Sequence, residues 1–317
     1  MKEFTIQKVE AGCRLDKYID KVLPKAPGSF KYKMLRKKNI TLNGKKAQGS
    51  ELLCAGDHVK FFLSDETFEK FAKEASTTSV KTPSFDKSGL IVLYEDDEIL
   101  AFHKPVGLLS QKSNPQDISV NDYLRTYLTQ NGEIFGSFMP SICNRLDRNT
   151  SGIILCGKSM EGSRELGRML KDRSLAKYYE CIVLGRANKG HIKGYLSKDE
   201  KTNKVTISSQ ETEGAAYIET AFEPIDYLEV CGRKLTKLSV HLITGKTHQI
   251  RSHMEDIGHP LIGDYKYGNR AVNEQFAQAY GVKSQLLHAK EVHFPKECTL
   301  QIRGQVITDP YVPWHFA

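Results

Sequence analysis

The chain has 317 residues, a formal net charge of +8 and 39% hydrophobic residues, which is enough apolar content for a packed core. It contains no apolar run of the ~18 residues that a membrane-spanning helix needs, and its first residues lack the apolar stretch of a signal peptide. The seven cysteines are scattered and never spaced as CxxC, a pattern that favours reduced thiols over disulfides or a zinc site. We therefore expect a cytoplasmic protein without a bound metal.

The excess positive charge lies in the first fifth of the chain. Residues 1–64 contain fourteen of the 46 Lys and Arg and six of the 38 Asp and Glu, a net charge of +8, and the rest of the chain sums to zero. A basic segment beside a neutral body indicates a module that binds a polyanion. The alternative is a lysine-rich surface that is merely solvated.

Apolar spacing predicts two short helices and a hairpin in this basic segment. RLDKYIDKVL places apolar residues at helical spacing, and SFKYKMLRKK predicts a second helix with Phe30, Met34 and Leu35 inward and its basic residues in water. ITLNGKKA then predicts a strand entering a tight turn at Asn43-Gly44, and HVKFFL a further strand. The pattern resembles the small RNA-binding fold of a primary-binding protein of the small ribosomal subunit and of bacterial tyrosyl-tRNA synthetases. By this resemblance, the residues expected to contact RNA are Arg14, Lys31, Lys33, Arg36, Lys37 and Lys38.

The composition changes twice further along the chain. Residues 64–88 are polar, lack a sustained apolar period and are interpreted as a linker. From residue 89 onward, mostly sequential strands with a few helices predict an α+β domain around a mixed, largely antiparallel sheet. The expected organisation is a small α/β RNA-binding domain over residues 1–63, the linker, and a catalytic domain over residues 89–317. GxGxxG does not occur, and we expect neither a dinucleotide nor a nucleoside triphosphate cofactor.

The segment NRLDRNTSG, residues 144–152, is a charged loop that leads into the buried strand SGIILCGK. Such a loop is a natural place for a catalytic carboxylate held by a rigid scaffold, and Asp147 is the candidate. The alternative is that Asp147 only caps a turn or pairs with Arg145 or Arg148. The longer string RLDxxTSG resembles the signature of the RluA family of pseudouridine synthases, which favours the catalytic interpretation.

Three further segments resemble that family in order and spacing. ILAFHKPVGLLSQ resembles its opening strand and loop, LAKYYECIVLG its Lys-x-Tyr strand, and TGKTHQIRSH its third motif; LLHAKEVHF matches its closing strand. The resemblance assigns Lys177 and Tyr179 to the second motif and Arg251 to the third. The order of modules is that of the RluC branch. Three residues depart from the family pattern: His103 stands in place of Asn, Asn144 in place of His, and Lys246 in place of Arg.

The resemblance implies isomerisation of uridine to pseudouridine in RNA, without a cofactor. Asp147 either attacks the anomeric carbon of the ribose or removes the 2′ proton, and the sequence does not choose between these routes. Both routes need an ionised carboxylate, which the nearby guanidinium of Arg251 would favour. Tyr179 would stack on the extruded base, whereas Tyr178 would face the opposite side of the strand. Arg145 would fill the gap that the flipped uridine leaves in its helix.

Other classes of protein are less compatible with this sequence. A non-catalytic RNA-binding protein would not need Asp147, a methyltransferase would carry a Gly-rich loop after its first strand, and a metal nuclease would carry a cluster of acids. His248, His253 and His259 lack metal-site spacing and are interpreted as structural or RNA-facing. We expect a monomer whose substrate is large-subunit ribosomal RNA, with transfer RNA as the alternative.

Overall fold

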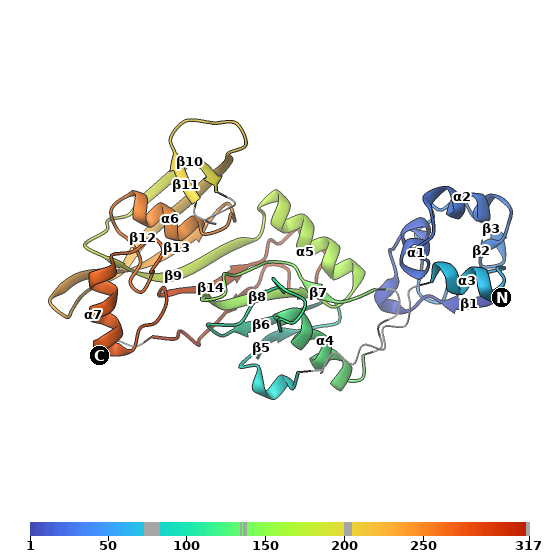
Figure 1. Cartoon of the computed structure of the whole chain (residues 1–317), viewed down its shortest axis with the longest axis horizontal. Coiled ribbons are helices and arrows are strands. Elements are labelled where there is room, and N and C mark those ends of the chain that lie inside the picture. The colour runs from blue at the N-terminus through green and yellow to red at the C-terminus, as the bar shows by residue number, and fades with distance from the viewer. Residues whose placement is uncertain (73–82, 134, 136–137, 200–204, 315–317) are drawn as a thin grey trace.

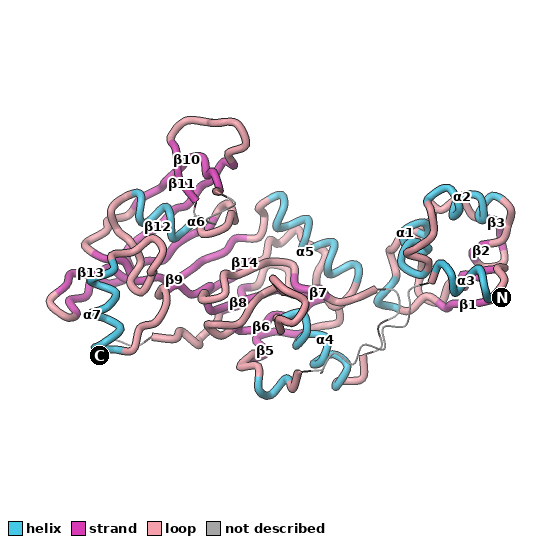
Figure 2. The backbone as a smooth tube through the Cα atoms, viewed as in Figure 1, coloured by secondary structure: helices cyan, strands magenta, loops and turns pink. Residues whose placement is uncertain are grey.

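The computed structural model describes residues 1–72, 83–133, 135, 138–199 and 205–314. These residues form a four-stranded sheet in the basic N-terminal segment and an eleven-stranded sheet in the remainder (Figures 1 and 2). None of the helices in these ranges has the length and apolar character that a bilayer crossing requires.

The N-terminal segment folds around its own apolar cluster. Its elements are β1 (Lys2–Thr5), a 3-10 turn (Lys8–Glu10), α1 (Leu15–Val22), α2 (Gly28–Arg36), β2 (Ile40–Leu42), β3 (Lys45–Lys46), β4 (His58–Phe61) and α3 (Asp65–Phe71). The strands pair antiparallel in the order β1-β4-β2-β3. Apolar residues of all three helices pack on this sheet, and the pair of helices and the hairpin expected from the spacing are confirmed.

The start of the expected linker is structured. Residues 65–71, which we assigned to a linker over residues 64–88, form helix α3, because Ser64 caps it by accepting a hydrogen bond from the N–H of Thr67 and Phe68 is buried in the N-terminal cluster. Residues 73–82 of that linker lie outside the described residues. The division into residues 1–63, 64–88 and 89–317 stays a prediction, with its first boundary moved past α3.

Lys31 is not on the solvated face of α2, contrary to the expectation. It stands three and four residues before the buried Met34 and Leu35, so it shares their face of the helix. Its side chain is buried and its ammonium forms an ion pair with Asp20 of α1. Lys31 therefore joins two helices of the module instead of facing a ligand.

The large sheet carries the remaining described elements. They are β5 (Ile91–Glu95), β6 (Ile99–Lys104), α4 (Val120–Gln130), β7 (Ser141–Ile142), β8 (Ser151–Gly157), α5 (Met160–Asp172), β9 (Ala176–Leu184), β10 (Gly190–Lys198), β11 (Val205–Ser208), β12 (Ala216–Val230), β13 (Arg233–Leu242), α6 (Gln249–Asp256), α7 (Arg270–Tyr280), β14 (Leu287–His293) and β15 (Val306–Thr308), with a 3-10 turn at Phe85–Lys87. The strand order is β11-β10-β12-β13-β9-β14-β8-β6-β5, with β15 on β14 and β7 on β8. Among the described strands only β14 and β8 pair in parallel, which confirms a mixed, largely antiparallel sheet.

Helices cover both faces of the sheet at β6 and β8, which explains why these strands are continuously apolar. Ile153 and Leu155 face α5, while Ile154 and Cys156 face α4. Strands that are buried on both faces do not need polar alternation. The rigid strand β8 begins at Ser151, directly after the loop that carries Asp147.

Gly152 of β8 lies directly against the backbone of Ala289 in β14. Its φ is +112°, and a Cβ there would lie 2.3 Å from the carbonyl oxygen and 2.5 Å from the nitrogen of Ala289. Both atoms belong to backbone, which cannot move aside as a flexible side chain would. The glycine of the TSG motif is therefore a packing requirement between two strands.

We predict that Gly152→Ala lowers the free energy of unfolding by at least about 2 kcal/mol, because it adds a backbone clash to an unfavourable φ. Urea denaturation followed by circular dichroism measures the change. Gly167→Ala is the matched control: this glycine is exposed on α5 with open space around it, so the substitution should stabilise the helix by about 0.5–1 kcal/mol. An equal response of the two variants would contradict the packing role of Gly152.

Candidate active site

Asp147 lies in a cleft of about 590 Å³ lined mainly by residues of four separate segments of the chain. Ser110 lies in the loop after β6, and Arg145 lies in the loop that leads into β8. Lys177 and Tyr179 lie on β9, and Arg251 lies in α6. The sheet order brings these segments together although they lie far apart in the sequence. The carboxylate is about 27% exposed in the cleft.

The backbone on each side of Asp147 is anchored by the loop that follows β6. The Ser110 hydroxyl accepts a hydrogen bond from the N–H of Leu146 at 3.0 Å and donates one to its carbonyl at 2.7 Å. On the other side, the Lys104 ammonium donates to the carbonyl oxygen of Arg148 at 3.1 Å and to those of Pro105 and Leu108. The opening motif HKPVGLLSQ therefore positions the loop that carries Asp147, a role that its sequence alone did not reveal.

Lys104 is fully buried, and this burial governs its ionisation. Burial lowers the pKa of Lys104 from its ordinary value to about 7, and the negative charge of Asp147 acts in the opposite direction. The three carbonyl acceptors match the three N–H bonds of an ammonium group. In its ammonium form, Lys104 therefore donates one hydrogen bond to each of the three carbonyl oxygens around it.

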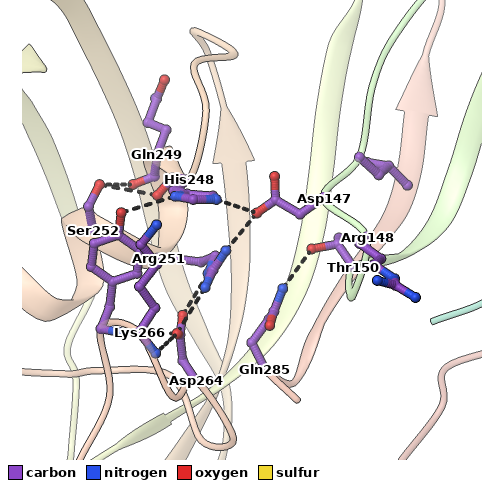
Figure 3. Close-up of polar contacts among 12 residues, drawn as sticks. Asp147, Arg148, Thr150, His248, Gln249, Arg251, Ser252, Asp264, Lys266 and Gln285 are labelled. Atoms are coloured by element: carbon purple, nitrogen blue, oxygen red, sulfur yellow. Dashed lines mark hydrogen bonds and ion pairs between the residues drawn. The ribbon is translucent and has the colours of Figure 1, made fainter. Parts of the chain in front are cut away.

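Arg251 of α6 connects Asp147 to a second carboxylate (Figure 3). Its Nη1 donates to Oδ2 of Asp147 at 2.9 Å, while Nε and Nη2 donate to the two oxygens of Asp264 at 2.6 and 3.0 Å. The ring of Tyr267 lies against the guanidinium, with 5.2 Å from its centre to Cζ. The pairing of Arg251 with Asp147 that the motif predicted is present in the structure.

Asp264 is completely buried and was not among the residues that the motifs singled out. Burial acts to raise the pKa of Asp264, but the hydrogen bonds and charge of Arg251, with the backbone N–H groups of Lys266 and Tyr267, outweigh burial and lower it. Burial likewise acts to lower the pKa of Arg251, and Asp264 and Asp147 reverse this effect and raise it. Asp264 and Arg251 are therefore both charged at neutral pH.

The alternation along β9 places Tyr179 and Lys177 in the cleft and Tyr178 on the other face of the sheet. Tyr179 and Lys177 line the cleft with Asp147, whereas Tyr178 stacks between His241 and His293. The predicted strand register is confirmed. Burial, followed by the charge of Asp147, raises the pKa of Tyr179, so its hydroxyl keeps its proton at neutral pH; burial lowers the pKa of Lys177.

Arg145 is exposed at the cleft, and within the described ranges it has no hydrogen bond or ion pair. The alternative, that it pairs with a neighbouring acid, therefore finds no support in the described residues. Arg14 behaves differently, because its guanidinium donates twice to Asp16 of the same module at 3.2 and 2.8 Å.

The three departures from the family pattern occupy different environments. Asn144 accepts a hydrogen bond from the N–H of Leu155 at 2.7 Å and holds the loop to β8. His103 is buried and its Nδ1 lies 2.7 Å from a carboxylate oxygen of Asp309. Lys246 is exposed and lines the cleft. Asn144 and Lys246 both line the cleft, so each can alter the surface that a substrate meets, whereas His103 is buried.

His248 and His253 of the third motif and the nearby His259 do not form a metal site. His253 is buried against Thr220, and His259 contacts the carbonyl of Leu184. His248 is different, because its Nε2 lies 3.8 Å from Oδ2 of Asp147. Within the described residues, no group of three or more His, Cys, Asp or Glu could hold a metal ion.

Comparison with known proteins identifies the class. Residues 98–256 match the family model described as RNA pseudouridylate synthase, which spans half of the chain and includes Asp147, Tyr179 and Arg251. The chain therefore belongs to the RNA pseudouridylate synthase family and is an RNA pseudouridine synthase, an isomerase. The RluA-type resemblance carried by the RLD and THQIR motifs is confirmed.

Individual relatives agree with this assignment. Ribosomal large subunit pseudouridine synthase C of Pasteurella multocida is 30% identical over 301 residues, which cover 93% of this chain and 86% of the relative. The protein of the same name from Vibrio cholerae is 29% identical over 286 residues, covering 90% and 85%. Among solved structures, human RNA Pseudouridylate Synthase Domain Containing 1 has a TM-score of 0.54 at 22% identity, covering 69% of this chain and 86% of that one. This structure supports the pseudouridine synthase fold.

The two carboxylates that Arg251 holds should differ in their effect on stability. We predict that Asp264→Asn lowers the free energy of unfolding by about 3–5 kcal/mol, because it removes one partner of a buried ion pair. Asp147→Asn is the matched control and should change it by less than about 1 kcal/mol, since its carboxylate is partly exposed and Arg251 keeps Asp264. Urea denaturation at neutral pH measures both variants, and a larger loss for Asp147→Asn would contradict this arrangement.

Proposed function

We propose that Asp147 is the catalytic carboxylate of this synthase, that Arg251 keeps it ionised and oriented, and that Tyr179 packs on the extruded uracil. The observation that supports this proposal is the 2.9 Å contact between Arg251 and Asp147 inside the cleft that Tyr179 lines. A fixed, ionised carboxylate can attack the anomeric carbon or remove the 2′ proton. The protonated hydroxyl of Tyr179 favours stacking and hydrogen-bond donation over proton abstraction.

Several cations around the cleft fit an RNA substrate. Arg145 and Lys246 are exposed there, and Lys177 lies deeper, beside Tyr179. None of the three has an ion-pair partner among the described residues, so their charges are available to phosphates. In this proposal Lys177 and Lys246 bind the backbone of the flipped nucleotide, and Arg145 occupies the gap that the uridine leaves.

We propose large-subunit ribosomal RNA as the substrate, with transfer RNA as the alternative. Support comes from the curated relatives, which align along more than four-fifths of their own length and carry the name ribosomal large subunit pseudouridine synthase C. We place the reaction in the cytoplasm and regard the enzyme as a monomer.

Mapping of pseudouridines in total RNA tests both the substrate and Asp147. In cells that lack this gene, we predict loss of pseudouridine at a few positions of large-subunit ribosomal RNA. Wild-type enzyme and the surface control Asp226→Asn should restore these positions, whereas Asp147→Asn should not, because the amide has no negative charge.

Two outcomes of this experiment would contradict different parts of the proposal. Loss confined to transfer RNA would overturn the ribosomal substrate and leave the catalytic assignment intact. Restoration by Asp147→Asn to within tenfold of wild type would overturn the catalytic assignment.

We further propose that the N-terminal module, residues 1–63 together with α3, binds RNA through the end of α2. Lys33, Arg36, Lys37 and Lys38 are exposed there and have no ion-pair partner in the described part of the chain. Four unpaired cations within six residues can contact neighbouring phosphates and release their counterions. Lys31 and Arg14 contribute less, because each already holds an aspartate.

We predict that alanine at Lys33, Arg36, Lys37 and Lys38 together weakens RNA binding and flattens its salt dependence. Each lost phosphate contact should reduce the log–log slope by about 0.7–0.9, which binding titrations between 50 and 200 mM salt would measure. The control replaces Lys234, Lys283, Lys296 and Arg303, which are exposed on the catalytic part, and removes the same charge. Equal slopes for the two quadruple variants would show that net charge alone, not this surface, determines binding.

A further inference from the structure

His248 has an unusual backbone conformation directly beside the catalytic pair. Its φ and ψ are 57° and 15°, in the left-handed region, and it is the residue that starts helix α6. Histidine adopts this region only occasionally, and such backbone strain clusters at functional sites. The conformation aims the imidazole into the cleft, with Nε2 at 3.8 Å from Oδ2 of Asp147 (Figure 3).

The other ring nitrogen is held by a buried tyrosine. Nδ1 of His248 lies 3.0 Å from the hydroxyl of Tyr267, and the same hydroxyl accepts a hydrogen bond from the N–H of Val205 at 3.0 Å. Tyr267 is 5% exposed, and burial raises its pKa, so the hydroxyl carries a proton. His248 is the one described acceptor available to that proton, and a buried donor without an acceptor would cost about 1–3 kcal/mol.

These contacts determine the tautomer of His248. If Nδ1 accepts from Tyr267, the proton of the neutral ring is on Nε2. Burial, followed by the charge of Arg251, lowers the pKa of His248 against the opposing charge of Asp147, in agreement with a neutral ring. The Nε2–H bond is therefore directed at the side of Asp147 that Arg251 also contacts.

Both donors address the same carboxylate oxygen. Oδ2 of Asp147 accepts a hydrogen bond from Arg251 at 2.9 Å and faces Nε2 of His248. Oδ1 of Asp147 has no hydrogen-bond partner among the described residues. A separation of 3.8 Å is longer than a hydrogen bond, but catalytic hydrogen bonds are often long without substrate and shorten in the complex. A movement of less than about 1 Å would complete this one.

We propose that His248 is a positioning residue of the synthase. Its Nε2–H, fixed by Tyr267, joins Arg251 in holding Oδ2 of Asp147, so that Oδ1 is the oxygen that acts on the target uridine. This inference rests on the proposed catalytic role of Asp147. It also makes Tyr267 a support of the site, because its hydroxyl orients His248 while its ring supports the Arg251 guanidinium.

Two substitutions at position 248 separate the donor from the backbone. Asparagine accepts the left-handed conformation but is too short to place a donor at the Nε2 position; glutamine can place its amide N–H there. We expect His248→Asn to lower kcat about 10- to 100-fold, the value of one hydrogen bond to a charged group, with KM within about twofold. His248→Gln should recover most of that loss.

The assay is single-site pseudouridine formation on a saturating RNA transcript, with thermal unfolding measured in parallel. His191→Asn is the control, because His191 is exposed on β10 and pairs with Glu219 away from the cleft; its kcat should equal that of wild type. A His248→Asn enzyme with wild-type kcat would overturn the proposal, and so would a glutamine variant no better than asparagine. Asp147→Asn in the same assay distinguishes failure of the proposed function from failure of this inference. An active Asp147→Asn enzyme would overturn the catalytic role of Asp147. An inactive Asp147→Asn enzyme together with a fully active His248→Asn enzyme would overturn only the role of His248.

A spectroscopic readout tests the tautomer directly. The measurement is a long-range ¹H–¹⁵N correlation spectrum of the full-length protein labelled with ¹⁵N-histidine. The signals of His248 are those that disappear in the His248→Asn variant. We expect these signals to have the pattern of an Nε2–H imidazole. Tyr267→Phe should convert this signal to a mixture of tautomers and lower kcat in the same direction as His248→Asn. An Nδ1–H pattern in the wild-type protein would overturn the role assigned to Tyr267 and to His248.

Discussion

The active site depends on one buried cation that binds two carboxylates. Arg251 lies in a low-dielectric interior, where an unpaired guanidinium would be strongly unfavourable, and Asp264 supplies a fully buried counter-charge held by two hydrogen bonds. This pair orients the guanidinium, so its remaining N–H bonds have a defined direction. Asp147 enters the site as the second, partly exposed acceptor. The carboxylate of Asp147 is thus held by a guanidinium whose own position is fixed by Asp264.

The fixed position of the Arg251 guanidinium explains why segments distant in the sequence contact the loop before β8. Asp147 must reach Arg251 without shifting, and Ser110 and Lys104 fix the backbone on either side of it. Gly152 then allows β8 to lie against β14 with no side chain between them. Each of these residues acts on position and not on the reacting atoms. Preorganisation of this kind places the charge before the substrate arrives, so no reorganisation is required during the reaction.

Substrate capture and chemistry use different parts of the surface in this account. Arg145, Lys177 and Lys246 line one cleft, whereas the exposed end of α2 belongs to a module with its own sheet and its own apolar cluster. The two parts contact each other through the exposed pair Lys8–Asp97, through Met160 against the N-terminal apolar cluster, and through Lys21 over the ring of Phe138. Affinity from phosphate contacts can therefore change without alteration of the Asp147–Arg251 geometry.

The sequence by itself determined those features that depend on local pattern. Helical spacing predicted α1 and α2, strand alternation placed Tyr179 and Tyr178 on opposite faces, and the RLD and THQIR strings identified the family and paired Asp147 with Arg251. Such features are encoded within a few neighbouring residues, or within a motif that identifies a family.

Only the tertiary structure decided which partner each polar side chain would find. Lys31 is of a residue type that usually lies on the surface, but it is on the buried face of its helix, where its ammonium forms an ion pair with Asp20 of another helix. His103 is paired with Asp309 across 206 residues of sequence, and His248 faces Asp147 because its backbone is left-handed and Tyr267 holds its ring. No local period records these pairings, because burial forces a polar group to find a partner and the fold alone determines which one is near.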